Sequence, residues 1–317
     1  NITNMDLLNK VIKNKDVEIK PIWLMRQAGR YLPEFREIRS RNQNFIELCL
    51  NKKLVPEITL QPLERFDFDA AIIFSDILMI PYGLNQKVEF KKNYGPILGE
   101  FHYSENFNIK KEDFKRKLKP VYESMSFLSD QLKGRSKSLI GFVGAPWTLL
   151  VYMLNQKSPK KVSSDDFLVD KSKVNKLLEM LIEYIKIHIE EQVKSGATII
   201  QIFDSWAGLV KDKDLDKYIY EPTKKVVQFT QSLDIPVICF PREIKDYSKY
   251  VKIVSPDVIS IDYNVNIRKI ADEIEIPIQG GLDPKILLSN PETLIKETKE
   301  ILNVFKNKPY IFNLGHG

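Results

Sequence analysis

The amino-acid sequence predicts an α/β fold, a (β/α)8 barrel of the TIM type. Eight short apolar runs, many of them β-branched, recur along the 317 residues, and segments of helix length separate them. Each run is almost continuously apolar, as a strand buried on both faces of a parallel sheet is. Strands that alternate with helices indicate a parallel sheet, and eight such units close into a barrel.

The first predicted strand comprises residues 21–25, and the other seven follow at intervals along the chain. They are residues 70–74, 138–143, 198–203, 236–240, 258–261, 277–280 and 310–314. Apolar residues at helical spacing predict helices over 171–194, 214–233 and 292–305. Residues 84–100 predict a hairpin inserted after the second strand, and residues 109–132 form a long approach to the third. No linker divides the chain, so we expect one domain over residues 1–317.

Composition and charge exclude several classes of protein. The sequence is 43% hydrophobic and 28% charged, and it has no apolar run of the ~20 residues that span a bilayer. The net charge is +6, but the lysines are scattered among glutamates, so we expect neither a nucleic-acid partner nor a membrane. Residues 1–6 lack the pattern of a secretory signal. The two cysteines, Cys49 and Cys239, lie far apart, which predicts a cytoplasmic protein without a cysteine-rich metal site.

Polar residues follow almost every predicted strand. In barrels of this type the active site lies at the carboxyl ends of the strands, so these residues should meet at one mouth. In chain order they are Arg26, Ser75, Asp76, Thr148, Tyr152, Asp204, Ser205, Asp262, Asp283, Asn313 and His316.

Arginine is concentrated after the first strand. Lysine outnumbers arginine 38 to 10, yet five arginines lie within sixteen residues. They are Arg26, Arg30, Arg36, Arg39 and Arg41. A guanidinium group binds carboxylates through two parallel hydrogen bonds, which lysine cannot do. Gln27-Ala28-Gly29 separates the first two arginines, and the glycine allows backbone N–H groups to approach an anion. The pattern therefore predicts an anion-binding site here.

The same segments resemble a known family. Residues 25–34 (MRQAGRYLPE) resemble the N-terminal signature of the uroporphyrinogen decarboxylases, and residues 141–149 (GFVGAPWTL) resemble a second signature. Further blocks match in the same order at residues 74–78, 203–208, 279–284 and 313–317. The resemblance covers essentially the whole chain.

This resemblance implies an enzyme of haem biosynthesis that needs no cofactor and forms a homodimer. Its reaction removes carbon dioxide from the four acetate side chains of uroporphyrinogen III and gives coproporphyrinogen III. By match to the motifs, the residues implied to contact the substrate are Arg26, Arg30, Asp76, Tyr152, Ser205 and His316.

The implied substrate predicts roles for these residues. It is a cyclic tetrapyrrole with eight carboxylates and four inward-facing N–H groups, so a carboxylate should accept those N–H groups while cations hold the rim. Asp76 is the candidate for the first role, and it would stabilise the cation formed when a pyrrole carbon is protonated. Arg26 and Arg30 are candidates for the second. An alternative role for Asp76 is a helix cap or turn residue.

Other residues are expected to complete the site. Gln27 and Ala28 would offer backbone N–H groups, and Phe74 and Phe203 would form apolar walls, although core packing explains these two phenylalanines nearly as well. Tyr152, Ser205 and His316 would position the substrate. The proton donor stays open among Arg26, Asp76, Tyr152 and His316, of which arginine is the poorest acid.

Two other functions compete with this interpretation. A zinc-dependent methyltransferase would share the barrel, but it would need a His-x-Cys pair near the fifth strand and a later cysteine. Val237 stands where that histidine would be, and no cysteine follows Cys239. A non-catalytic tetrapyrrole-binding protein would not need the full set of Asp76, Arg26, Arg30 and Tyr152.

Overall fold

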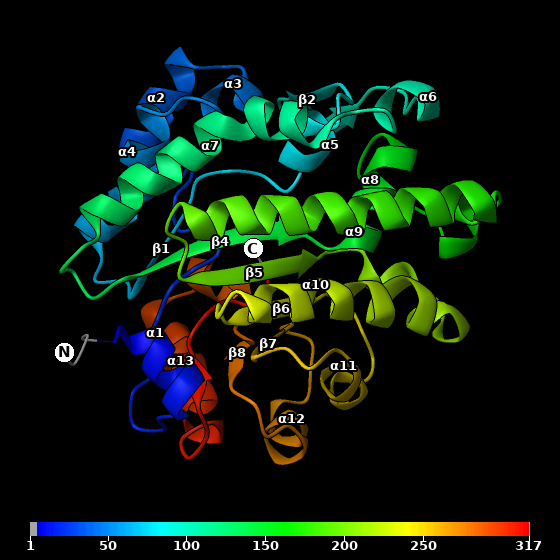
Figure 1. The fold of residues 1–317 in the computed structure, drawn as a ribbon. Helices are drawn as coiled ribbons and strands as arrows, with labels where there is room; N and C mark the ends of the chain where they lie inside the picture. Colours follow the sequence, from blue (N-terminus) through cyan, green and yellow to red (C-terminus); the bar gives the residue numbers. More distant parts are fainter. Residues whose placement is uncertain (1–4, 317) are drawn as a thin grey trace.

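The computed structural model describes residues 5–316, and within that range seven parallel strands curl into most of a barrel (Figure 1). In spatial order they are β1 (Ala70–Ile72), β4 (Ser138–Gly144), β5 (Ile199–Asp204), β6 (Val237–Pro241), β7 (Val258–Ile261), β8 (Ile278–Gly280) and β9 (Tyr310–Ile311). Residues 1–4, which belong to the N-terminal segment without a signal pattern, and Gly317, at the end of the last family block, lie outside the described residues. The predicted barrel class is confirmed.

The first predicted strand, residues 21–25, is not a regular strand. Only Ile22 forms a bridge, parallel to Phe312, and the Phe312 N–H donates to the Pro21 carbonyl over 2.8 Å. On its other side, Asp69 N–H donates to the Ile22 carbonyl over 2.8 Å. Proline has no N–H, and the Ile22 N–H donates to the Asp69 side chain (2.7 Å), so a longer ladder cannot form. The segment nevertheless closes the barrel between β9 and β1.

Buried polar side chains anchor this closing segment inside the barrel. The indole N–H of Trp23 donates to Oε1 of Gln279 over 2.9 Å. The Gln279 amide in turn donates to Oε1 of Gln201 (3.0 Å) and to the Ser260 hydroxyl (3.1 Å). All four side chains are fully buried. Because buried polar groups are stable only in such paired arrangements, the network fixes the depth of the segment that carries Arg26.

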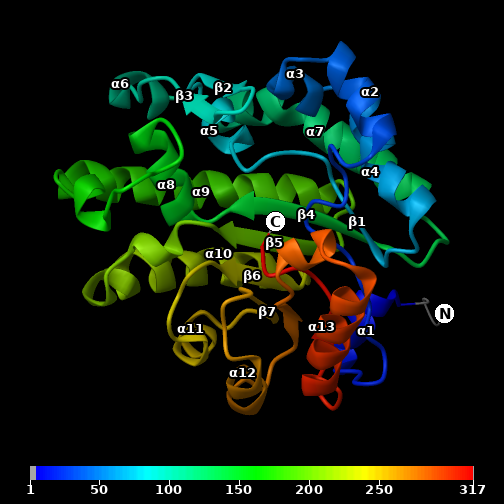
Figure 2. The same cartoon turned by 180° about the vertical axis from the view of Figure 1, so that it is seen from behind.

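Helices surround the sheet (Figures 1 and 2). Before β4 the chain forms α1 (Leu7–Asn14), α2 (Pro33–Arg41), α3 (Phe45–Cys49), α4 (Leu54–Arg65), α5 (Met79–Gly83), α6 (Tyr103–Asn106) and α7 (Lys111–Gln131). After β4 it forms α8 (Pro146–Asn155), α9 (Lys171–Lys194), α10 (Glu221–Ser232), α11 (Tyr247–Val254), α12 (Ile267–Glu273) and α13 (Pro291–Val304). Within residues 5–316, no helix has both the length and the apolar character that crossing a membrane requires.

Most predicted elements outside the sheet are confirmed. The helix predicted over 171–194 has the same ends as α9, and α13 begins one residue before the predicted 292. The inserted hairpin consists of antiparallel strands β2 (Val88–Lys91) and β3 (Gly95–Leu98). The long approach at 109–132 is the helix α7. The helix predicted over 214–233 is divided into a π-helical turn, Asp216–Tyr220, and α10.

One histidine lies deep in the helical layer. His188 on α9 is 3% exposed, and its Nδ1 lies 2.8 Å from the Tyr122 hydroxyl on α7. Burial lowers the pKa of His188 to about 3, since the charged imidazolium would lose its hydration. In the unfolded chain, His188 binds a proton at a pH near the ordinary histidine pKa. In the folded chain, it stays neutral until the pH is far lower. The protein should therefore lose stability as the pH falls below about 6.5.

We predict that the variant His188→Asn reduces this loss. Asparagine keeps an acceptor for Tyr122 but does not titrate. Urea unfolding at about pH 7 and about pH 5 should show that the wild-type protein loses about 2 kcal/mol more than the variant between the two conditions. The exposed His102→Asn serves as the matched control and should behave like the wild type. Equal pH dependence in all three proteins would contradict the lowered pKa.

Candidate active site

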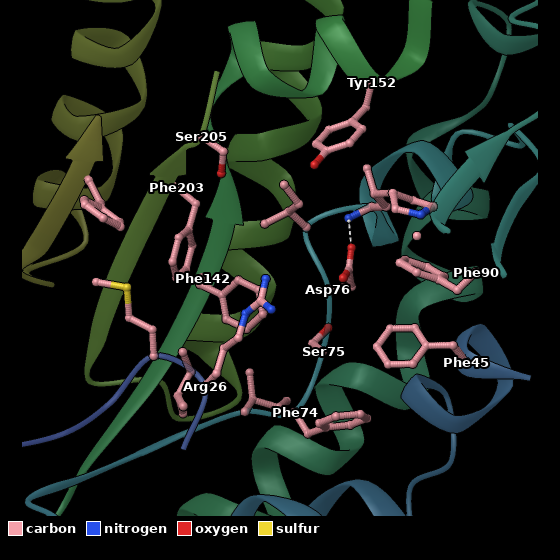
Figure 3. A pocket seen from close by; sticks show the side chains of 18 of the residues that line it. Arg26, Phe45, Phe74, Ser75, Asp76, Phe90, Phe142, Tyr152, Phe203 and Ser205 are labelled. Carbon is pink, nitrogen blue, oxygen red and sulfur yellow. Dashed lines mark hydrogen bonds between the residues drawn. The ribbon is translucent and has the colours of Figure 1, made fainter. Parts of the chain in front are cut away.

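The carboxyl ends of the strands surround a cavity of about 620 Å³ (Figure 3). Its lining comes from the segment after Ile22, the loop after β1, the β2–β3 hairpin, and the ends of β4, β5 and β6. Eight of the ten predicted site residues line it: Arg26, Ala28, Phe74, Asp76, Tyr152, Phe203, Ser205 and His316. Residues up to 290 positions apart in the sequence thus meet at one mouth, as the barrel topology predicts.

Asp76 is positioned by the loop between β1 and α5. Its Oδ1 accepts a hydrogen bond from the Leu78 N–H over 2.8 Å, and its carbonyl accepts the Met79 N–H at the start of α5. The residue is therefore a turn carboxylate and a cavity residue at once. Figure 3 shows the carboxylate beside the central space. Burial raises the pKa of Asp76 to about 6, against the opposing effects of the Leu78 N–H and the Arg26 charge.

Arg26 and Tyr152 reach toward the same space from other elements. Arg26 follows the closing segment, and Tyr152 lies on α8 after β4. In Figure 3 the Arg26 guanidinium, the Tyr152 hydroxyl and the Ser205 hydroxyl are turned inward, like the Asp76 carboxylate. Burial raises the pKa of the Tyr152 phenol, and the Asp76 charge raises it further. Tyr152 therefore keeps its proton at neutral pH and acts as a hydrogen-bond donor.

Aromatic side chains form two walls of the cavity. Phe142, Phe203 and Phe240 follow each other across β4, β5 and β6, with ring centroids 5.5 and 6.4 Å apart and edge-to-face orientation. On the other side, Phe45 lies 5.7 Å from Phe74 and 4.5 Å from Phe90 on the hairpin. Of these rings, the sequence predicted only Phe74 and Phe203. Apolar walls with polar groups between them suit a weakly polar ring that carries charged arms.

Gln27 and Arg30 lie outside the cavity lining. The Gln27 side chain is 1% exposed, accepts the Leu24 N–H over 3.1 Å and donates to the Ala70 carbonyl over 2.9 Å. It ties the closing segment to β1, which is a structural role. Arg30 is exposed near the start of α2, and its charge lies close enough to Arg39 to lower the pKa of that residue after the larger effect of burial.

Arg242 lines the cavity but was not predicted from the sequence, whereas Asp204 was expected at the mouth and supports it. Arg242 directly follows β6, just as Arg26 directly follows an apolar run, so the same signal could have found it. Asp204 ends β5 with 1% exposure, and the Thr148 hydroxyl donates to its Oδ1 over 2.6 Å. Thr148 also accepts the Trp206 N–H (3.1 Å), so Asp204 supports the Ser205 loop. Burial raises the pKa of Asp204 to about 7.

The side chains present do not match a zinc site. Among residues 5–316, no group of three or more His, Cys, Asp or Glu side chains could hold a metal ion. Cys239 is fully buried on β6, and burial raises the pKa of its thiol to about 12, which disfavours the thiolate that binds zinc.

We predict that Asp76→Asn stabilises the folded protein at neutral pH. Because the folded-state pKa of Asp76 is raised, the folded protein holds a proton that the unfolded chain releases, and the contribution of Asp76 to stability falls as the pH rises from about 4 to about 6. Asparagine removes that penalty and keeps the oxygen that caps Leu78. Urea unfolding should show a gain of about 1 to 2 kcal/mol at about pH 7, since part of the side chain stays in contact with solvent, and little gain at about pH 4. The exposed Asp272→Asn is the control, and a gain that is the same at both pH values would contradict the raised pKa.

The fold is shared with solved structures of other function. A methyltransferase from Methanosarcina mazei aligns with a TM-score of 0.77 at 15% identity, covering 98% of this chain and 93% of that one. A B12-independent methionine synthase from Shewanella sp. W3-18-1 aligns with a TM-score of 0.53 at 12% identity, covering 85% and 81%. At these identities the likeness shows the fold alone.

Sequence relatives are much more similar. A uroporphyrinogen decarboxylase from Rickettsia bellii is 42% identical over 319 residues, covering 99% of this chain and 93% of that protein. The enzyme of the same name from Rickettsia felis is 39% identical over 303 residues, covering 94% and 87%. The family model for uroporphyrinogen decarboxylase matches residues 3–317. The chain therefore belongs to the uroporphyrinogen decarboxylase family.

Proposed function

We propose that this chain removes the four acetate carboxyl groups of uroporphyrinogen III, giving coproporphyrinogen III, in the cavity at the carboxyl ends of its strands. Decarboxylase activity of this kind follows from the family to which the chain belongs. The observation that supports this location is the meeting of a carboxylate, Asp76, and a guanidinium, Arg26, between two aromatic walls. A macrocycle with an apolar face, inward N–H groups and acidic arms matches that combination.

Asp76 is the residue to which we assign cation stabilisation. Once a ring carbon beside an acetate arm is protonated, the pyrrole becomes cationic and takes up the electron pair as carbon dioxide leaves, so the ring itself serves as the electron sink. The methylene carbon that remains then takes up a proton and becomes the methyl group, while the ring carbon releases the proton it had gained and the aromatic pyrrole is restored. A carboxylate held against the pyrrole N–H groups stabilises that cation without reorganisation. Its pKa of about 6 keeps most of the group ionised at neutral pH in the empty cavity, and N–H donors favour the ionised form further.

The remaining residues receive roles in recognition and proton transfer. Arg26 would bind an acidic arm, and Ser205 and His316 would position the substrate. Tyr152 keeps its proton, because its pKa is raised, and would donate a hydrogen bond to a carboxylate of the substrate. We assign the proton transfer to Asp76 as well, because its carboxylate lies beside the central space and its pKa of about 6 suits the exchange of a proton near neutral pH.

We predict that Asp76→Asn loses at least about 100-fold in kcat, because the amide cannot stabilise the pyrrole cation. The assay is carbon dioxide release from enzymatically generated uroporphyrinogen. Asp272→Asn should keep the wild-type rate. Near wild-type turnover by a folded Asp76→Asn protein would overturn the assigned role, whereas no turnover by the wild-type protein itself would overturn the proposed function.

We further propose that residues 1–317 form one domain, that the protein is a homodimer, and that it works in the cytoplasm. One sheet joins strands from Ala70 to Ile311, which supports the first proposal. The resemblance to the family supports the second. Cys49 and Cys239 are buried free thiols, as is usual in a reducing compartment, which supports the third.

For the homodimer, sedimentation equilibrium at micromolar concentration should show a species of twice the chain mass of 36.9 kDa. If the protein sediments as a 36.9 kDa species across the whole concentration range, the homodimer is contradicted, while the decarboxylase assay tests the activity separately.

A further inference from the structure

Arg242 has a place in the cavity that the family resemblance does not assign. It directly follows β6, and it lines the same cavity as Arg26 and Asp76. Its side chain is 17% exposed, so the charge is largely withdrawn from bulk solvent. An unpaired cation in this position would lose favourable hydration, which costs free energy. A largely buried cation also attracts an incoming anion more strongly than a surface cation does.

Asp262, at the end of β7, holds Arg242 in place. The Arg242 Nη2 and Nε lie 3.5 Å from Oδ1 and Oδ2 of Asp262. Asp262 is itself fixed, since Oδ2 accepts the Glu243 N–H over 3.0 Å and Oδ1 accepts the Tyr263 N–H over 3.2 Å. Its side chain is 6% exposed. The guanidinium is therefore held by an anchor that is rigid before any ligand arrives.

This ion pair leaves much of the guanidinium unsatisfied. Both contacts are long for charge-assisted hydrogen bonds, which usually measure about 2.7–2.9 Å. A guanidinium has five N–H donors. The Arg242 Nε is buried beside Asp262, so the donors for a ligand are those of the two terminal nitrogens, of which Nη2 donates to Asp262 over 3.5 Å. Arg242 thus has donor capacity to spare for a carboxylate that enters the cavity.

The strand order puts Arg242 opposite Arg26. Around the barrel the order is the Ile22 segment, β1, β4, β5, β6, β7, β8 and β9, after which the Ile22 segment follows again. In this ring of eight, the segment that leads to Arg26 and the strand that leads to Arg242 are four places apart in either direction. The two arginines therefore start from opposite walls of one cavity. The row Phe142, Phe203 and Phe240 forms the wall that leads round to β6.

We propose that Arg242 is a second carboxylate-recognition residue, which binds an acidic arm on the edge of the macrocycle opposite the edge held by Arg26. Asp262 acts as its positioning residue. The inference rests on the proposed function, because it takes uroporphyrinogen as the ligand. One cation would leave the macrocycle free to rotate about a single held arm, whereas two opposed cations fix its plane and its orientation over Asp76. Each turn of the ring by one pyrrole brings new arms to the same pair.

The test compares Arg242→Gln with Arg242→Lys, Asp262→Asn and the control Arg268→Gln. Arg268 lies exposed on α12, away from the cavity lining, and its replacement changes the net charge by the same amount. We expect Arg242→Gln to raise KM for uroporphyrinogen about tenfold, with kcat within about threefold of wild type. Arg242→Lys and Asp262→Asn should raise KM less, because the first keeps the charge and the second keeps the guanidinium. Arg268→Gln should leave both constants unchanged.

Two further readouts separate recognition from a structural role. The wild-type KM should rise with salt more steeply than the KM of Arg242→Gln, since the variant lacks one screened charge contact. Anaerobic titration with coproporphyrinogen III, followed by tryptophan fluorescence, should show weaker binding by the folded variants in the same order as KM. If Arg242→Gln does not fold, the same measurements are made on Arg242→Lys and Asp262→Asn.

Specific outcomes overturn the proposal. A folded Arg242→Gln whose KM and salt dependence equal those of Arg268→Gln would show that Arg242 only pairs with Asp262. A fall in kcat with unchanged KM would contradict a role in recognition. Both results require turnover by the wild type and by Arg268→Gln, and the loss of turnover in those two proteins would instead contradict the proposed function.

Discussion

The barrel of this protein is closed by a single bridge residue, and the position of Arg26 in the cavity depends on that closure. Ile22 forms one parallel bridge to Phe312, after β9, and its carbonyl accepts the Asp69 N–H, before β1. Pro21 has no N–H to extend the ladder. The segment has few ladder hydrogen bonds, but buried side chains hold it from inside the barrel. The Trp23 indole donates to Gln279, and the Gln279 amide donates to Gln201. Because the Ile22 segment is held from inside the barrel, it can turn sharply where it reaches the cavity. Arg26 lies in that turn.

The cavity combines a carboxyl group of raised pKa with guanidinium groups and aromatic walls. Asp76 is stable in this place because the Leu78 N–H and the Arg26 charge offset part of the penalty of burial. The remaining penalty is the source of the predicted gain in stability when the charge is removed. Such a balance is typical of functional sites, where a group is kept in a protonation equilibrium that suits its chemistry and the rest of the fold supplies the stability.

The likeness to the methyltransferase concerns the fold alone, since the two chains align over nearly their full length at 15% identity. In this chain, Val237 and the buried Cys239 on β6 provide no zinc-binding pair. The chemistry therefore depends on the side chains at the carboxyl ends of the strands, separately from the fold. This separation is general in barrels, since the strands and helices provide stability while the carboxyl-end loops can vary.

The sequence by itself determined the features that depend on local patterning. Continuous apolar runs predicted the seven strands of the sheet, and helical periodicity predicted both ends of α9. The family motifs named Asp76, Arg26 and Tyr152, which line one cavity. Such features can be predicted because hydrophobic periodicity and short motifs depend on residues that are neighbours in the sequence.

Only the tertiary structure decided which side chains share the cavity. Gln27, in the middle of the most specific motif, turns away to bind the Ala70 carbonyl. Phe45 on the short helix α3 and Phe90 on the inserted hairpin turn toward each other and line the cavity. Arg242 is held by Asp262 across the gap between two strands and stands opposite Arg26 because the barrel closes. Such contacts join residues that are distant in the chain, and no local pattern records which face of the barrel they will share.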